Sequence, residues 1–227
     1  IKYFDMKTQR LICFAIVLLL ISSSCATFKS SMDGKYEKEA EKNYNAERVD
    51  VLFIFSHYRQ TKGFDAVPKL DPRPVNGFEE IFVDAMTEIS NISYYSVFTD
   101  HASDVNISKR RRMKDSLMNS HDYIIKVKIQ REKSFVKYFF ATVGAVVSAT
   151  LLPMPFKYEY TAKIEVLDSN RKLIKAYERK MEITKCWQTF MFFLYPFKNE
   201  ERQKGLLYVE ILHDVFKQIE SEKILKK

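Results

Sequence analysis

The chain has 227 residues, of which 46% are hydrophobic and 29% charged, and its formal net charge is +8. This composition excludes a low-complexity or disordered chain, and the length fits one domain with a sizeable core. Aromatic residues are abundant and glycines number only 5, which indicates a packed globular domain.

The N-terminal stretch predicts export. Lys7 and Arg10 precede an uncharged apolar run, Leu11–Ile21, and three serines follow it. This order is typical of a secretory signal peptide, and the apolar run is too short for an ordinary spanning helix. We expect translation to begin at Met6, so that residues 1–5 are an upstream artefact and residues 6–24 are the signal.

Cys25 directly follows the serines, and this ending resembles the bacterial lipobox of the lipoprotein family. There the cysteine thiol receives a diacylglyceryl group and the signal is cut just before it. The usual box has leucine three residues before the cysteine, where this chain has Ser22, so an ordinary secretory signal or an uncleaved anchor stays open. Ala26 stands where an aspartate would resemble an inner-membrane retention signal. The resemblance therefore implies a lipid-anchored envelope protein of the outer membrane.

The net charge limits the kinds of partner that the chain could bind, and the cysteine content limits its disulfide bonds. Removal of residues 1–24 takes away three cations and one anion, which leaves a net charge of +6. An exported basic protein rarely meets nucleic acid, so we expect anionic lipid headgroups, glycan polymers or an acidic partner instead. With Cys25 acylated, Cys186 is the only other cysteine of the mature chain, which excludes an internal disulfide.

The predicted mature chain begins with a tether and continues as one domain over residues 49–227. Residues 26–48 mix charges with few aliphatic side chains, so we predict a flexible tether that lets the domain stand off a membrane. Val49–Phe55 is a nearly continuous apolar run, typical of a central strand. Three prolines mark residues 57–74 as a loop.

Helices and strands alternate through the first half of this domain. Apolar residues recur at helical spacing over about 77–90 and again over 201–223, at the end of the chain. A short strand is predicted at 94–98 and a polar helix at 107–118.

Period-two alternation predicts three further strands, at 122–133, 158–167 and 172–183. The last two form a hairpin, because residues 168–171 read DSNR and predict a tight turn. On the last strand we expect three buried side chains, Leu173, Tyr177 and Met181. The resulting order, β-α-β-α-β-β-β-α, predicts an α+β domain with a single mixed or antiparallel sheet and helices packed mainly on one face.

Two segments, Tyr138–Phe156 and Trp187–Phe197, carry no charged residue. We reject a membrane span for the first, because it would place two halves of one sheet on opposite sides of the bilayer. If the three alternating strands are antiparallel neighbours, both segments lie at one end of the sheet and the DSNR turn lies at the other.

Together these segments would form an apolar end-cap. Large exposed apolar patches mark interaction sites, so we expect a contact surface for lipid or for a protein partner. The alternative is that the two segments pack on each other and on the domain's own helices. The candidate residues are the large apolar and aromatic ones: Tyr138, Phe139, Phe140, Leu151, Leu152, Trp187, Phe192, Phe193 and Tyr195.

The whole pattern resembles a family of small bacterial envelope lipoproteins of uncharacterised function. The matching pieces are ISSSC, VDVLFIF, ATLLPMPFKYEY, IEVLDSNRKLIKAY and FFLYPF. The family combines a lipobox, a β-α-β start, an apolar loop ending in proline, a hairpin, an aromatic-proline segment and a C-terminal helix. The start is also similar to the amino-terminal domain of TolB, a periplasmic partner-binding module. Neither resemblance implies catalysis. We expect a binding or assembly module with a membrane anchor and a protein partner or oligomer.

Motifs for chemistry are absent from the sequence. The four histidines lack metal-ligand spacing, so we expect no metal, no cofactor and no catalytic residue, and we expect Cys186 to be a buried structural thiol. A basic run could contact phosphate or anionic lipid, the alternative being a solvated helix face; it comprises Lys109, Arg110, Arg111 and Arg112. An envelope hydrolase stays the alternative function, and a deep cleft that holds two or more histidines with an acid would favour it.

Overall fold

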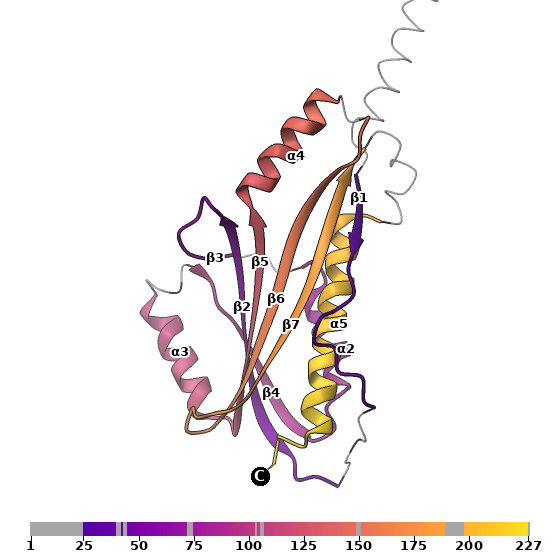
Figure 1. The fold of residues 1–227 in the computed structure, drawn as a ribbon. Coiled ribbons are helices and arrows are strands. Elements are labelled where there is room, and N and C mark those ends of the chain that lie inside the picture. Colours follow the sequence, from indigo (N-terminus) through magenta and orange to yellow (C-terminus); the bar gives the residue numbers. More distant parts are fainter. Residues whose placement is uncertain are drawn as a thin grey trace, which may run out of the picture.

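The computed structural model describes residues 25–39, 42, 45–71, 75–102, 104, 107–148, 151–188 and 198–226. The expected signal peptide and residues 189–197 of the second apolar segment lie outside them. The strands are β1 (Cys25–Lys29), β2 (Val49–Lys62), β3 (Lys69–Leu70), β4 (Ile92–Thr99), β5 (Tyr123–Ser134), β6 (Met154–Asp168) and β7 (Leu173–Trp187). The helices are α2 (Phe78–Met86), α3 (Ser108–Asn119), α4 (Phe135–Val147) and α5 (Glu200–Ser221) (Figure 1).

Within these ranges seven strands form one mixed sheet in the order β1-β7-β6-β5-β2-β3, and β4 also pairs with β2. The strands β5, β6 and β7 are antiparallel neighbours, whereas β4 and β5 run parallel to β2. The predicted α+β class with a single mixed sheet is confirmed.

Strand β2 is the centre of the domain because both of its faces are apolar. Val51, Phe53 and Phe55 join the core beneath α2 and α5. Leu52 and Ile54 join a second, smaller core beneath α3. All five side chains are buried, which explains the nearly continuous apolar run in the sequence.

The helices α2 and α3 lie on opposite faces for a topological reason. The chain leaves β2, crosses to β4 through α2, and then crosses back over β2 to β5 through α3. Right-handed crossovers that run in opposite directions along a sheet place their helices on opposite faces. The larger core nevertheless lies on the face that α2 and α5 share, as expected for helices packed mainly on one side.

A buried ion pair fixes the long helix α5 to β7. The Nε atom of Arg179 lies 2.6 Å from Oδ2 of Asp214, and each side chain is 6% exposed. Arg179 also donates to Gln218, and the backbone amide of Tyr36 donates to Oδ1 of Asp214 at 2.9 Å. The Asp214 carboxylate therefore joins β7, α5 and the N-terminal segment.

The predicted flexible tether over 26–48 is wrong for its first part. Strand β1 pairs antiparallel with β7 along its whole length, Ala26 and Thr27 are buried, and Asp33 bridges to Lys180. The outer edge of β7 offers unpaired backbone groups, and β1 satisfies them. The chain after Cys25 is thus part of the sheet.

Three smaller predictions are also wrong. Strand β2 continues through the predicted loop as far as Lys62, because β5 pairs with it up to Ser134. Leu173 is 52% exposed, since it lies beside the hairpin turn. The first apolar segment opens with α4, a helix that the sequence pattern did not predict.

In the described ranges, no helix is both long enough and apolar enough to cross a bilayer.

Replacement of Asp214 by alanine should leave the Arg179 guanidinium buried without its carboxylate. Loss of one partner of a buried ion pair costs about 3–5 kcal/mol, and we expect urea denaturation to show a loss of that size. The control is Glu178→Ala on the same strand, whose pairs with Lys163 and Lys180 are exposed and should matter by less than about 1 kcal/mol. Equal effects of the two substitutions would contradict this role of Asp214.

Candidate functional site

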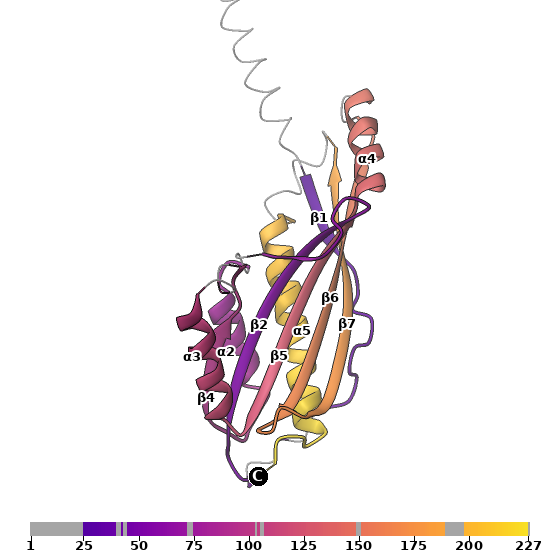
Figure 2. The same cartoon turned by 90° about the vertical axis from the view of Figure 1, so that its left-hand side faces the viewer.

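The strand register brings the two apolar segments together at one end of the sheet. Met154 at the start of β6 pairs with Trp187 at the end of β7, and Cys25 at the start of β1 pairs with the same Trp187. Helix α4 begins where β5 ends. Figures 1 and 2 show α4 beyond the end of β5, at the same end of the molecule as the start of β1, and the β6–β7 turn at the opposite end. The predicted placement is confirmed for the described residues.

One side of α4 is held against the sheet. Ser134 caps the helix, because its hydroxyl accepts a hydrogen bond from the amide of Lys137 at 3.4 Å. The Tyr138 ring packs edge-on against buried Phe156 at 4.8 Å between centroids. Phe156 in turn lies 5.1 Å from the Trp187 ring. Tyr138 and Trp187 are therefore supports of the helix, and neither is a fully exposed contact residue.

Gly144 allows α4 to approach the start of β6 closely. A Cβ atom at this position would lie 3.0 Å from the sulfur of Met154, which is shorter than ordinary van der Waals contact. Ala145 is the buried residue of the helix. Small side chains on this side thus set the distance between helix and sheet.

The other side of α4 is exposed and apolar. Phe64, Phe135, Phe139 and Phe140 form a row of ring contacts with centroids 5.7–6.3 Å apart. Phe140 is 66% exposed and Val147 is 82% exposed. The exposed large residues of this region are Phe64, Phe135, Val136, Phe139, Phe140, Val143, Val146, Val147, Leu151 and Leu152. We call α4 with Leu151, Leu152 and Trp187 the apolar end-cap.

The exposure of the candidate residues shows which of them are available for contact. Phe139, Phe140, Leu151 and Leu152 are exposed, as a contact surface requires. Within the described residues the end-cap is therefore not ordinary core. Three further candidates, Phe192, Phe193 and Tyr195, lie outside the described residues.

Lysines surround the attached end of α4. Together with Tyr138, Phe140 and Phe156 they line a depression of about 510 Å³. Lys62 pairs with Glu132 at 2.6 Å, and Lys157 pairs with Glu182 at 3.3 Å. The Nζ atom of Lys133 lies 4.2 Å from the centroid of the Tyr138 ring. We call Lys62, Lys133, Lys137 and Lys157 the lysine collar.

The predicted basic run does not join this surface. Lys109, Arg110, Arg111 and Arg112 lie on α3, which Figures 1 and 2 show well away from α4. The four side chains are not equivalent. Arg110 pairs with Asp104 at 2.6 Å and packs over the Phe98 ring at 4.9 Å, so it has a structural role.

A polar cavity of about 530 Å³ lies between the larger core and the start of α5. Its wall includes His57, Arg131, Tyr160, Lys204 and Tyr208. His57 is 4% exposed, and neither ring nitrogen has a hydrogen-bond partner among the described residues. Its ring stacks on Tyr208 at 5.7 Å. The sequence pattern missed this site because residues 57–74 were predicted as a loop. Alternate residues of a strand share a face, so the buried face of Val51, Phe53 and Phe55 continues to position 57.

Burial sets the protonation states of the histidine and tyrosine side chains that line this cavity. It lowers the pKa of His57 to about 4, against the opposing charge of Asp71. It raises the pKa of Tyr160 and of Tyr208, so both phenols keep their protons at neutral pH. The described wall contains one histidine and no serine, threonine or cysteine. This arrangement can bind a small polar molecule, but it does not bring together the two histidines that a hydrolase site was expected to need.

Two further histidines, His213 and His121, make structural contacts. His213 on α5 contacts Glu88 at 2.8 Å and Asp84 at 3.0 Å, which ties α5 to α2 and the residues just after it. His121 contacts the Leu117 carbonyl at 2.7 Å, at the end of α3. Burial raises the pKa of the half-buried Cys186 thiol, which keeps it protonated. Among the described residues, no group of three or more histidine, cysteine or acidic side chains could hold a metal ion.

No protein-family model and no curated protein matches this chain. Among solved structures it is similar to a PelC dodecamer from Paraburkholderia phytofirmans, with 9% identity over 87% of this chain and 98% of that chain and a TM-score of 0.30. A variant of the same dodecamer matches with 10% identity over 85% of this chain and 98% of that chain, also at 0.30. Similarity at this level carries no argument about function.

The exposure of the end-cap can be tested by stability. Phe140→Ser should reduce the free energy of unfolding by less than about 1 kcal/mol, because 66% of the residue already faces solvent. Phe156→Ser, at the same end but 3% exposed, should cost about 3–5 kcal/mol. Chemical denaturation measures both. A large loss for Phe140→Ser would show that the end-cap is core.

The lowered pKa of His57 predicts a loss of stability in acid. The unfolded chain protonates this histidine near pH 6.5, whereas the folded protein resists protonation down to about pH 4. The unfolded state therefore binds more protons in that window, and stability falls by roughly 3 kcal/mol as the pH drops through it. His57→Phe keeps a flat ring without a titrating group and should remove this part of the slope. Urea denaturation from pH 7 to pH 4 measures it; identical slopes in both proteins would contradict the assignment.

Proposed function

We propose that this chain is a lipid-anchored protein of the bacterial envelope, held in the outer membrane through Cys25. In this proposal it is a non-catalytic binding or assembly module, and the apolar end-cap is its contact surface. The observation that carries the proposal is that the end-cap and the start of β1 lie at the same end of the sheet.

The short connection between Cys25 and the sheet supports the proposal. Since β1 begins at Cys25 and Ala26 is already buried, little free chain separates the predicted lipid attachment from the domain. A lipid at this position would hold the domain close to the membrane, with the end-cap turned towards the bilayer surface. The flexible stand-off that the sequence pattern predicted would have left the orientation of the domain undefined.

An envelope hydrolase has less support. It would need a cleft in which two histidines and an acid meet, and the polar cavity offers His57 alone among the described residues. Exposed apolar surface is the more specific feature of this molecule, because a patch of this kind in a stable domain marks an interaction site.

The anchor is tested by metabolic labelling with a radioactive fatty acid. Cys25→Ser should abolish the label and release the domain from the membrane fraction, because acylation needs the Cys25 thiol. Cys13→Ser and Cys186→Ser serve as controls and should keep full label. Unchanged label in Cys25→Ser would overturn the anchor.

The binding role is tested by crosslinking in intact envelopes, followed by purification of the full chain. A Phe139→Ser, Phe140→Ser double variant should lose the lipid or protein that is crosslinked to the parent through the end-cap. Ile174→Ser is the matched control, because Ile174 is 44% exposed at the opposite end of the sheet. Loss of crosslinks in the control variant as well would contradict a specific role for the end-cap.

A further inference from the structure

The exposed side of α4 has a composition that few occupants fit. At 100° per residue, Phe135, Val136, Phe139, Phe140, Val146 and Val147 fall within an arc of roughly 140°. None of these exposed side chains can form a hydrogen bond. A protein interface of useful size contains about one hydrogen bond per 100–200 Å², whereas the hydrocarbon of a bilayer offers none and requires none. The composition of this arc therefore favours lipid.

The length of α4 sets the depth that it could reach. Its 13 residues extend over about 20 Å, which is shorter than the hydrocarbon core of about 30 Å. A helix of this length, with one apolar side and its other side held by Tyr138 and Gly144, is suited to lie at the boundary of headgroups and acyl chains. It is not suited to cross the bilayer.

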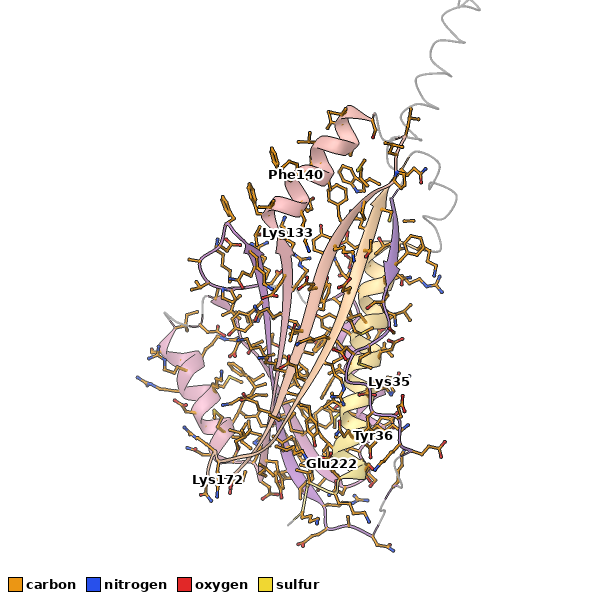
Figure 3. The ribbon with its side chains drawn as sticks, in the orientation of Figure 1. Lys35, Tyr36, Lys133, Phe140, Lys172 and Glu222 are labelled. Atoms are coloured by element: carbon orange, nitrogen blue, oxygen red, sulfur yellow. The ribbon has the colours of Figure 1, made fainter. Side chains whose placement is uncertain are left out.

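The lysine collar supplies complementary charge at the edge of the apolar surface. Lys133 and Lys137 form no ion pair with the described part of the chain. Lys62 and Lys157 are partly neutralised by Glu132 and Glu182. Basic residues near an anionic membrane surface contribute about 1 kcal/mol each. Figure 3 shows Lys133 and Phe140 together at this end, and Lys172 at the opposite end.

Cys25 is close enough to α4 for a lipid on Cys25 and the exposed side of α4 to enter the same leaflet. Cys25 and Met154 pair with opposite edges of the strand β7 at Trp187. Neighbouring strands are about 4.8 Å apart, so their backbones are separated by about 10 Å. Met154 in turn contacts Gly144 of α4. A diacylglyceryl group on Cys25 would therefore enter the membrane beside α4.

We infer that the occupant of the apolar end-cap is the lipid leaflet that holds Cys25. In this arrangement the exposed side of α4 lies among the acyl chains, and Lys133 and Lys137 contact anionic headgroups. This inference rests on the proposed lipid-anchored function and names the partner of the same surface.

The test uses the full acylated chain in proteoliposomes of phosphatidylcholine and phosphatidylglycerol. In a Cys13→Ser, Cys186→Ser background, Phe140→Cys or Val147→Cys carries an environment-sensitive fluorophore. Ile174→Cys, at the opposite end, is the matched control. Spin-labelled lipids should quench the probes at positions 140 and 147 several-fold more than the probe at position 174. Equal, weak quenching at all three positions would overturn the inference.

The outcomes separate this inference from the proposed function. Weak lipid quenching at position 140, combined with end-cap crosslinks to a protein in envelopes, would overturn the leaflet inference while the binding module stands. Strong quenching in a chain that mass spectrometry shows to be unacylated would support leaflet insertion and overturn the Cys25 anchor.

The headgroup contacts are tested by charge removal. Lys133→Gln with Lys137→Gln should lower the insertion equilibrium in phosphatidylglycerol vesicles about thirtyfold and should have little effect in pure phosphatidylcholine. Added salt should reduce the difference between the two lipids in the parent, because it screens exposed charges. Lys172→Gln is the control. An unchanged lipid preference in the double variant would overturn the assignment of these lysines.

Discussion

The pairing of β6 with both of its neighbours is the constraint on which the rest of the structure depends. Residues 159–168 of β6 pair with β5 on one edge, and residues 154–167 pair with β7 on the other, with one register shift between Val166 and Leu167. A slip of one residue would turn the inward side chains of β6 to the opposite face. The same register fixes which chain ends meet. It brings α4, the start of β6 and the end of β7 together, and it leaves the edge of β7 free for β1.

The helix α5 closes the larger core over this sheet, and Asp214 makes its position specific. Apolar packing alone tolerates sliding of a helix along a sheet, whereas a buried carboxylate must keep its partners. Arg179 from β7 and the amide of Tyr36 meet this carboxylate from two directions. The N-terminal segment is thereby held twice, by β1 at the end near Trp187 and by Tyr36 further along α5. This double attachment is the physical reason that the first part of the predicted tether is structured.

The sequence pattern predicted most of the fold because alternation and helical spacing are local signals. Ile164 and Val166 of β6 are buried, as the alternation of apolar residues along the strand predicted. Strand β1 could not be predicted in this way, because its five residues are too few for a pattern and its place depends on the free edge of β7. The polar cavity was missed for a related reason. The three prolines at 68, 72 and 74 suggested a loop, although β2 continues past His57 because it pairs there with β5.

Helix α4 shows why the candidate site was predicted in position but not in form. Its valines and aromatic residues favour strands and its glycine disfavours a helix, so propensity pointed away from the helix that forms. The chain leaves β6 after Glu132, although β6 continues as Met154–Tyr158 paired with β7, and as a helix α4 satisfies its own backbone groups. The exposed side chains of α4 belong to neither core cluster of the described residues. The helix is packed through Tyr138 and Gly144, and the apolar character of its other side has no explanation within the described residues. A leaflet beside Cys25 would cover that side and would also account for the lysines at its edge.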